Sequence, residues 1–183
     1  MIQMNSDAAE LIPIRLIMSV AIIGVISVLF TSGMLTLQTQ TDIHQIDQQI
    51  NDFKASIQVL MKQGSARDIS DPLSSNGSKR TFVFHLPDNI EFLSFGGDNN
   101  IKKGLNENTS NQLMTGIFYQ FQGKTKQVVW LESGYGMIQG HYVDDCWIPI
   151  KVPDPLILDH CGLVTVNVEL IKMHDTQYLL MYS

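Results

Sequence analysis

The pattern of hydrophobic and polar positions begins with one long uncharged run. No Asp, Glu, Lys or Arg occurs between Arg15 and Asp42, and Leu16 to Leu37 is a stretch of 22 mostly apolar residues without proline. At about 1.5 Å per helical residue, this length covers the hydrocarbon core of a bilayer, which is about 30 Å thick. The pattern therefore predicts a transmembrane helix over residues 16–37.

A cleaved signal and a helix of a soluble domain are the two alternatives for this run. A secretory signal begins with Lys or Arg and has a shorter apolar core, but the preceding segment, residues 1–15, contains Asp7 and Glu10 and no basic residue before Arg15. A buried helix of a soluble domain is disfavoured because residues 16–30 carry no charge on any face. We therefore expect the segment to be retained and to cross the membrane once.

The charges on either side of the run predict its orientation. Arg15 is the only Lys or Arg before Lys54, whereas three aspartates follow the apolar run, at Asp42, Asp47 and Asp52. Basic residues are enriched on the cytoplasmic side of a membrane span. We expect the N-terminus in the cytoplasm and the C-terminal domain outside the cell.

The next pattern is an apolar stripe with a helical period. Apolar side chains recur at intervals of 3, 4, 3, 4 and 3 residues, at Ile43, Ile46, Ile50, Phe53, Ile57 and Leu60. Gly64 then supplies a stop signal. Because no proline or turn cluster separates the stripe from the apolar run, it predicts an amphipathic extension of the same helix, residues 38–63.

Two interpretations of this stripe lead to different assemblies. The stripe can pair with copies of itself in a coiled-coil stalk, or it can lie against a sheet of its own domain. The positions that flank it are mostly Gln, Asp and Ser, so they offer few of the opposite-charge pairs that fix a coiled-coil partner. This composition favours packing on the chain's own sheet.

Beyond Gly64 the pattern changes to short strands. A linker rich in Ser, Gly and Asp, residues 64–79, leads to residues 80–183, in which β-branched and aromatic runs alternate with turn signals. The clearest turns are Pro87-Asp88-Asn89, Gln122-Gly123-Lys124 and His174-Asp175. Pro149 fits an edge strand. About nine strands without a second helix predict an α+β chain, in which one long N-terminal helix precedes an all-β antiparallel sandwich.

The predicted export bears on how the cysteines and the glycosylation sequons are interpreted. Cys146 and Cys161 are the only two cysteines, and an even pair in an exported domain favours a disulfide, with two unpaired thiols as the alternative. Sequons occur at Asn76-Gly77-Ser78 and Asn108-Thr109-Ser110, both in expected surface segments. Asn76 and Asn108 are therefore candidate N-glycosylation sites.

Catalytic and cofactor motifs do not emerge from the sequence. His141, Asp144 and Asp145 form the best polar cluster, but strand alternation places Asp144 on the opposite face from the other two. Trp130 and Trp147 fit either a core or a sugar-binding face. The net charge of −6 and pI of about 5.2 argue against nucleic acid as a partner. We predict a non-enzymatic protein without a metal or cofactor.

The order of these elements resembles that of the type IV pilin-like proteins, above all the archaeal pilins and archaellins. The shared features are an acidic residue shortly before a long apolar run, a helix that continues as an amphipathic stripe, and a C-terminal all-β domain. The run RTFVFHLPDNIEFLSFGG, residues 80–97, is also similar to a strand, Pro-Asp turn and FGG run of archaeal secreted proteins with such N-termini.

The resemblance implies a function in assembly at the cell surface. In that family a peptidase removes a short leader, and the mature helices bundle into a filament with copies or related subunits. Glu10 then corresponds to the acid that neutralises a neighbour's N-terminal amine, and Arg15 needs an acidic or headgroup partner. Alternatively, Asp7 and Glu10 cap the helix, and the chain is a monomeric tethered module that recognises a sugar, a protein or an envelope component.

Overall fold

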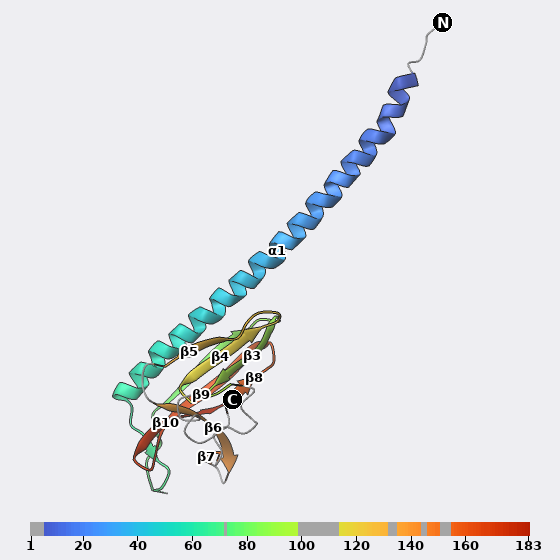
Figure 1. Ribbon diagram of the computed structural model, residues 1–183. Coiled ribbons are helices and arrows are strands. Elements are labelled where there is room, and N and C mark those ends of the chain that lie inside the picture. The colour runs from blue at the N-terminus through green and yellow to red at the C-terminus, as the bar shows by residue number, and fades with distance from the viewer. Residues whose placement is uncertain (1–5, 72, 99–113, 132–134, 144–145, 151–154) are drawn as a thin grey trace. The chain divides into compact units, whose positions relative to one another are not determined.

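One long helix and ten strands make up the described part of the chain (Figure 1). The computed structural model describes residues 6–71, 73–98, 114–131, 135–143, 146–150 and 155–183, with side chains from residue 14 onward except at positions 35 and 36. The elements are α1 (Ser6–Gln63), β1 (Arg67–Asp68), β2 (Lys79–Leu86), β3 (Ile90–Phe95), β4 (Gly116–Phe121), β5 (Gln127–Trp130), β6 (Gly136–Val143), β7 (Cys146–Pro149), β8 (Leu156–Leu158), β9 (Gly162–Met173) and β10 (Thr176–Tyr182).

The chain divides into two compact units, Met1–Asp42 and Ile43–Ser183. The boundary falls inside α1, because the helix runs on from Ser6 to Gln63. The first unit contains the apolar part of the helix, and the second contains its amphipathic part together with all described strands. The expected continuation of one helix across both patterns is confirmed.

The strands form a six-stranded and a four-stranded sheet. In the larger one, here called sheet A, the order is β1-β9-β10-β6-β7, and β2 also pairs with β9. In the smaller one, sheet B, the order is β5-β4-β3-β8, and every described pair is antiparallel. The antiparallel sandwich expected from the sequence is therefore wrong in detail, because sheet A is mixed: β10 runs parallel to β6, and β1 runs parallel to β9.

The parallel direction of β6 and β10 has a simple physical origin. A tight hairpin forces two strands to run antiparallel, but β6 and β10 are separated by β7, β8 and β9 along the chain. Their relative direction is then set by long-range packing, which the local turn signals do not reveal. The coarser expectation of an α+β chain with a single N-terminal helix is confirmed for the described residues.

The three turn signals are confirmed. The Ile90 amide donates a hydrogen bond to the Pro87 carbonyl at 3.1 Å, closing a turn between β2 and β3. Gly123 has a φ of 69° in the β4–β5 hairpin. His174 and Asp175 have φ values of 49° and 64°, as a two-residue turn with two left-handed positions requires. Pro149 ends β7, the edge strand of sheet A, as expected.

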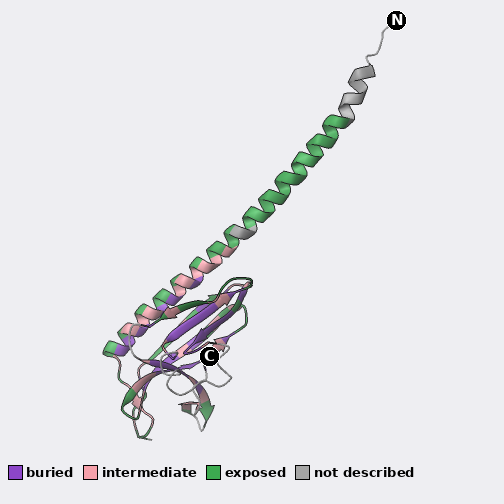
Figure 2. Cartoon of the chain, in the orientation of Figure 1, coloured by how far each residue is buried: buried purple, intermediate pink, exposed green. Residues whose placement is uncertain are grey.

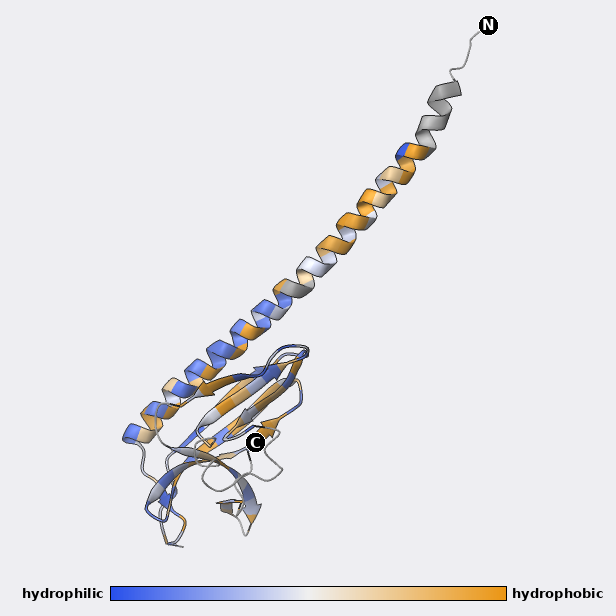
Figure 3. Cartoon of the chain, viewed as in Figure 1, coloured by the Kyte–Doolittle hydropathy of each residue, from blue (hydrophilic) through white to orange (hydrophobic). Residues whose placement is uncertain are grey.

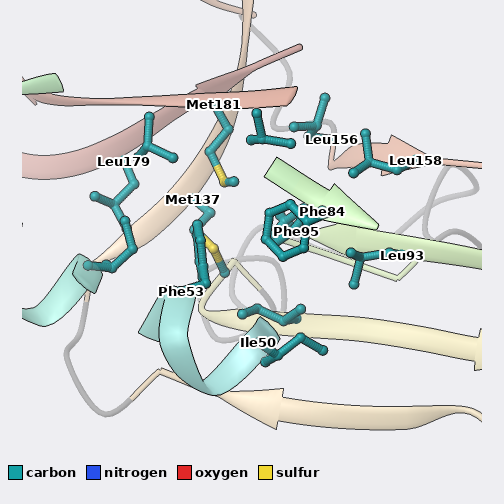
Figure 4. Packing of buried hydrophobic residues seen from close by; sticks show 14 of the residues in the cluster. Ile50, Phe53, Phe84, Leu93, Phe95, Met137, Leu156, Leu158, Leu179 and Met181 are labelled. Atoms are coloured by element: carbon teal, nitrogen blue, oxygen red, sulfur yellow. The ribbon is translucent and has the colours of Figure 1, made fainter. Parts of the chain in front are cut away.

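The stripe of α1 is buried in the second unit, which confirms packing on the chain's own sheets. Its residues Ile46, Ile50, Phe53, Ile57 and Leu60 belong to the main hydrophobic core together with residues of both sheets. Figure 2 shows the same alternation of buried and exposed positions along this part of the helix. Phe53 lies among three aromatic rings, with ring centroids 4.7 Å from Phe82, 5.8 Å from Phe84 and 5.2 Å from Phe95. Figure 4 shows Phe53 together with Phe84 and Phe95 in the core.

A second, smaller cluster covers the other face of sheet A. Along β10, Leu179 and Met181 belong to the main core, whereas Leu180 and Tyr182 belong to the small cluster with Ile171 of β9. Successive side chains of a strand point to opposite faces, so the two clusters lie on opposite faces of this sheet.

Candidate functional site

The first candidate is the apolar part of α1. The described side chains from Ile14 to Leu37 are exposed, including 65 % of Leu16 and 69 % of Leu37. Figure 3 shows that this part of the helix is hydrophobic, whereas polar positions dominate nearer Gln63. By length and composition, α1 is one helix near the N-terminus that is long and apolar enough to cross a membrane.

Three hydroxyl groups described within this segment are satisfied by the helix itself. Ser19 Oγ donates to the Arg15 carbonyl at 2.9 Å, and Ser27 Oγ donates to the Ile23 carbonyl at 2.8 Å. Thr31 Oγ1 donates in the same way to the Ser27 carbonyl at 2.8 Å. Such bonds to the carbonyl four residues earlier remove the need for water. The small polar residues are therefore compatible with an apolar surrounding.

The residues predicted for assembly are placed only in part. Arg15 is exposed on α1. Glu10 lies within the helix, but its side chain is outside the described part, as is that of Asp7. The expected pairing of Glu10 with an amine, and of Arg15 with an acidic partner, stays a prediction.

The second candidate is a pocket of about 460 Å³ in the unit Ile43–Ser183. It is lined by β1 and the residues after it, by the start of β2, by β7 and by Glu169 of β9. Glu169 lies between Val168 and Leu170, which face the main core. Its side chain therefore points to the opposite face of sheet A, where the small cluster lies.

The floor of the pocket is a buried ion pair. Arg67 Nε donates to Glu169 Oε1 at 2.8 Å, and Arg67 Nη2 donates to Glu169 Oε2 at 3.3 Å. The side chain of Glu169 is 1 % exposed and that of Arg67 is 13 % exposed. Arg67 Nη2 also donates to the Trp147 carbonyl at 2.7 Å, so the same guanidinium links β1, β9 and β7.

Two further groups complete the coordination of Glu169. The Gly77 amide donates to Glu169 Oε1 at 3.1 Å, and Lys79 Nζ lies 3.7 Å from Oε2. A Cβ atom at Gly77 would come within 2.1 Å of the Leu170 carbonyl oxygen. The backbone can approach Glu169 this closely because residue 77 is glycine.

Aromatic residues flank this ion pair. The Trp147 ring stacks on Tyr182 with a centroid separation of 4.1 Å and an interplanar angle of 12°. Burial, followed by the negative charge of Glu169, raises the pKa of Tyr182. Trp130 instead lies on sheet B, where its ring centroid is 5.9 Å from that of Phe118. The structure therefore does not bring the two tryptophans together into one aromatic face.

The remaining predicted residues are placed as follows. Cys146 and Cys161 are both free and exposed, rather than joined by the bridge that the sequence favoured. Asn76 is exposed and lines the pocket, whereas Asn108 lies outside the described residues. His141 lies on β6, but Asp144 and Asp145 are outside the described part, and the described residues contain no group of three or more metal-ligating side chains.

This pocket is not predicted from the sequence because its residues are far apart in the chain. Arg67 and Glu169 are separated by 102 positions, and Arg67 fell in the expected linker. A usable signal was present in LVTVNVELIKM, where a single acid interrupts a long strand-forming run. A buried charge needs a partner.

No protein-family model, curated protein or solved structure matches this chain.

Proposed function

We propose that this protein is a non-enzymatic, single-pass membrane subunit of a pilin-like surface assembly. The observation that carries the proposal is that the two parts of α1 differ in burial. Side chains of the apolar part, residues 14–37, are exposed wherever they are described, whereas the stripe from Ile46 to Leu60 is buried in the β-sheet domain. The amphipathic half is already used inside the chain, and the apolar half still needs a partner.

Two surroundings can cover the apolar half. Removing one large apolar side chain from water stabilises by about 1.5–3 kcal/mol, so a segment of this size does not stay in water. Lipid covers it in a membrane, and the same segment of other copies covers it in a helical bundle. A coiled coil through the Ile43–Leu60 stripe would compete with the main core, because the stripe contributes to that core.

Charges near the helix start have different surroundings in an assembly and in a plain anchor. Glu10 precedes the apolar run, and Arg15 directly adjoins it. Ionised groups are costly in hydrocarbon unless they are paired. In an assembly, Glu10 pairs with the N-terminal amine of a neighbouring copy and Arg15 with an acidic or headgroup partner. In a tether, both groups lie at the cytoplasmic edge of the membrane.

The decisive experiment determines the N-terminus of the protein from native membranes together with its state of association. We expect intact-mass and N-terminal peptide data to reveal a new terminus near Ala8 to Glu10. We also expect shearing of the cells to release the chain in sedimenting filaments. An intact Met1 on a monomer extracted by detergent contradicts assembly.

A monomeric tethered binding module is the second candidate function. The pocket above Glu169 favours it, because a charged and partly apolar pocket on the β-sheet domain is a candidate ligand site in its own right. On this alternative, α1 only holds the domain at the membrane. The same two measurements separate the candidates.

A further inference from the structure

We propose that the pocket above the Arg67–Glu169 pair binds a saccharide unit. This inference goes beyond the proposed function, since it applies to an assembled and to a monomeric chain alike. The pocket volume of about 460 Å³ lies within the range of about 300–1,000 Å³ that is common for small-molecule sites.

The carboxylate at the floor of the pocket is held by several partners. Glu169 accepts hydrogen bonds from Arg67 and from the Gly77 amide, and Lys79 lies 3.7 Å away. Because these contacts fix the residues after β1 against β9, the polar groups that surround the pocket are held before a ligand arrives. Such preorganisation lowers the entropic cost of binding.

The rim offers hydrogen-bond donors and acceptors together. Asp68 Oδ1 accepts from the Ser70 amide at 2.8 Å, and Asp71 Oδ1 accepts from the Leu73 amide at 2.9 Å. The turn at Asp71 holds its carboxylate at the rim, whereas the Asp68 side chain points to the opposite face of β1 from Arg67, where its charge acts on Lys172. The Lys79 side chain, 45 % exposed, adds donors, and the Asn76 amide adds a donor and an acceptor.

This combination selects against small ions. A free anion would meet the carboxylates of Asp71 and Glu169, and a metal ion would meet the guanidinium and ammonium groups of Arg67 and Lys79. A sugar is neutral, and each of its hydroxyl groups can donate and accept. A saccharide can therefore donate hydrogen bonds to the carboxylates and accept them from the cationic side chains at the same time.

The apolar part of the lining suits the carbon face of a sugar ring. Ile69, Trp147 and Ile148 contribute apolar surface to the same pocket. The stacking of Trp147 on Tyr182 holds its ring in one orientation. Aromatic side chains present a large apolar body at low entropic cost.

Two sources can supply the saccharide. Asn76 begins the sequon Asn76-Gly77-Ser78 and is exposed at the pocket. A glycan attached to Asn76 would place its first sugars at the pocket of the same chain. Alternatively, the sugar belongs to a glycan on another molecule or surface. The chemistry is shared, and the experiment below separates the sources.

The first arm measures binding of free sugars to full-length, unglycosylated protein. The chain is held in phosphocholine micelles, since alkyl-glycoside detergents belong to the ligand class. Methyl glycosides of glucose, galactose, mannose, N-acetylglucosamine and N-acetylgalactosamine are tested by saturation-transfer NMR. We expect transfer to at least one of them, with a shift of the Trp147 indole N–H signal and none at Trp130.

Two substitutions test whether the binding occurs in this pocket. Lys79→Ala and Asn76→Ala each remove rim hydrogen bonds and should weaken the affinity about fivefold to tenfold. Arg80→Ala is the matched control, because it removes the same charge at the next residue of β2, whose side chain points to the other face of the strand. Binding that both variants leave unchanged overturns the proposal.

The second arm examines Asn76 in protein from native membranes. A glycan on Asn76, with a Trp147 indole signal that Asn76→Gln shifts toward its position in the unglycosylated chain, assigns the sugar to the same chain. An unmodified Asn76 together with binding in the first arm assigns it to another molecule. An unmodified Asn76 together with no transfer from any of the five glycosides overturns the proposal, whatever the state of assembly.

Discussion

Glu169 lies within β9, the longest strand of the domain, and its carboxylate is held by Arg67, Lys79 and the Gly77 amide. Isolated charges in such surroundings are strongly unfavourable, so each partner depends on the others. The pair ties β1 to β9 and to the Trp147 carbonyl of β7. At the scale of single residues, this contact orders the segment that the sequence analysis interpreted as a linker.

Removal of the acid should show this dependence directly. Glu169→Ala leaves the Arg67 guanidinium and the Gly77 amide without their acceptor, and should lower the free energy of unfolding by about 3–5 kcal/mol. Urea unfolding followed by tryptophan fluorescence measures it, because both tryptophans lie in the unit Ile43–Ser183. Glu91→Ala, at an exposed position of β3, should change the free energy by no more than about 0.5 kcal/mol. A loss below about 1 kcal/mol for Glu169→Ala would contradict the structural role.

Tyr119 gives the domain a dependence on alkaline pH. Burial, followed by its hydrogen bond to Asp47 and the charge of that carboxylate, raises the pKa of Tyr119 above its ordinary value of 10.0. The unfolded chain then loses this proton at lower pH than the folded chain. The associated stability is fully present below about pH 10 and is lost as pH rises further.

We therefore expect the urea midpoint of the wild-type protein to fall above pH 10. Tyr119→Phe has no proton to lose at this position, so its midpoint should fall less steeply over the same range. At pH 7 the variant should differ only by the lost hydrogen bond to a charged carboxylate, about 1.5–3 kcal/mol. Parallel pH profiles for the two proteins would show that Tyr119 does not contribute.

At the scale of elements, the amphipathic half of α1 is an integral part of the β-sheet domain. Phe53 is 1 % exposed and contacts rings of β2 and β3. Phe53→Ala should lower the free energy of unfolding by about 3–5 kcal/mol, since it deletes this buried ring. Val59→Ala on the same helix, at a position that is 41 % exposed, should have a much smaller effect. Equal effects of the two substitutions would contradict the packing.

The sequence predicted those elements whose signals are local. A period of three and four residues defines the helix face, and Pro87, Gly123 and the His174-Asp175 pair mark turns that need few other contacts. The parallel pairing of β6 with β10 has no such signal, because it depends on how the remaining strands pack. The pocket shares this property, since its parts become neighbours only when β1, β7 and β9 meet.

At the scale of the whole molecule, composition marks the one described segment that is long and apolar enough to cross a membrane. The apolar run of α1 has no charge from Leu16 to Thr41, and its described side chains from Ile14 to Leu37 are exposed. The β-sheet domain, by contrast, has its own core. The apolar run can therefore be changed without altering that core.

Charges placed in the apolar run provide the test of membrane attachment. The double substitution Ile22→Arg and Ile26→Arg puts two guanidinium groups near the middle of the proposed span, at a cost of about 2.5–3.5 kcal/mol each for insertion. We expect the variant to be released by alkaline carbonate, whereas wild-type protein stays in the membrane pellet. The matched control is the double substitution Gln38→Arg and Gln40→Arg, which adds the same charge beyond Leu37. Retention of both variants in the pellet would mean that the apolar run does not hold this protein in the membrane.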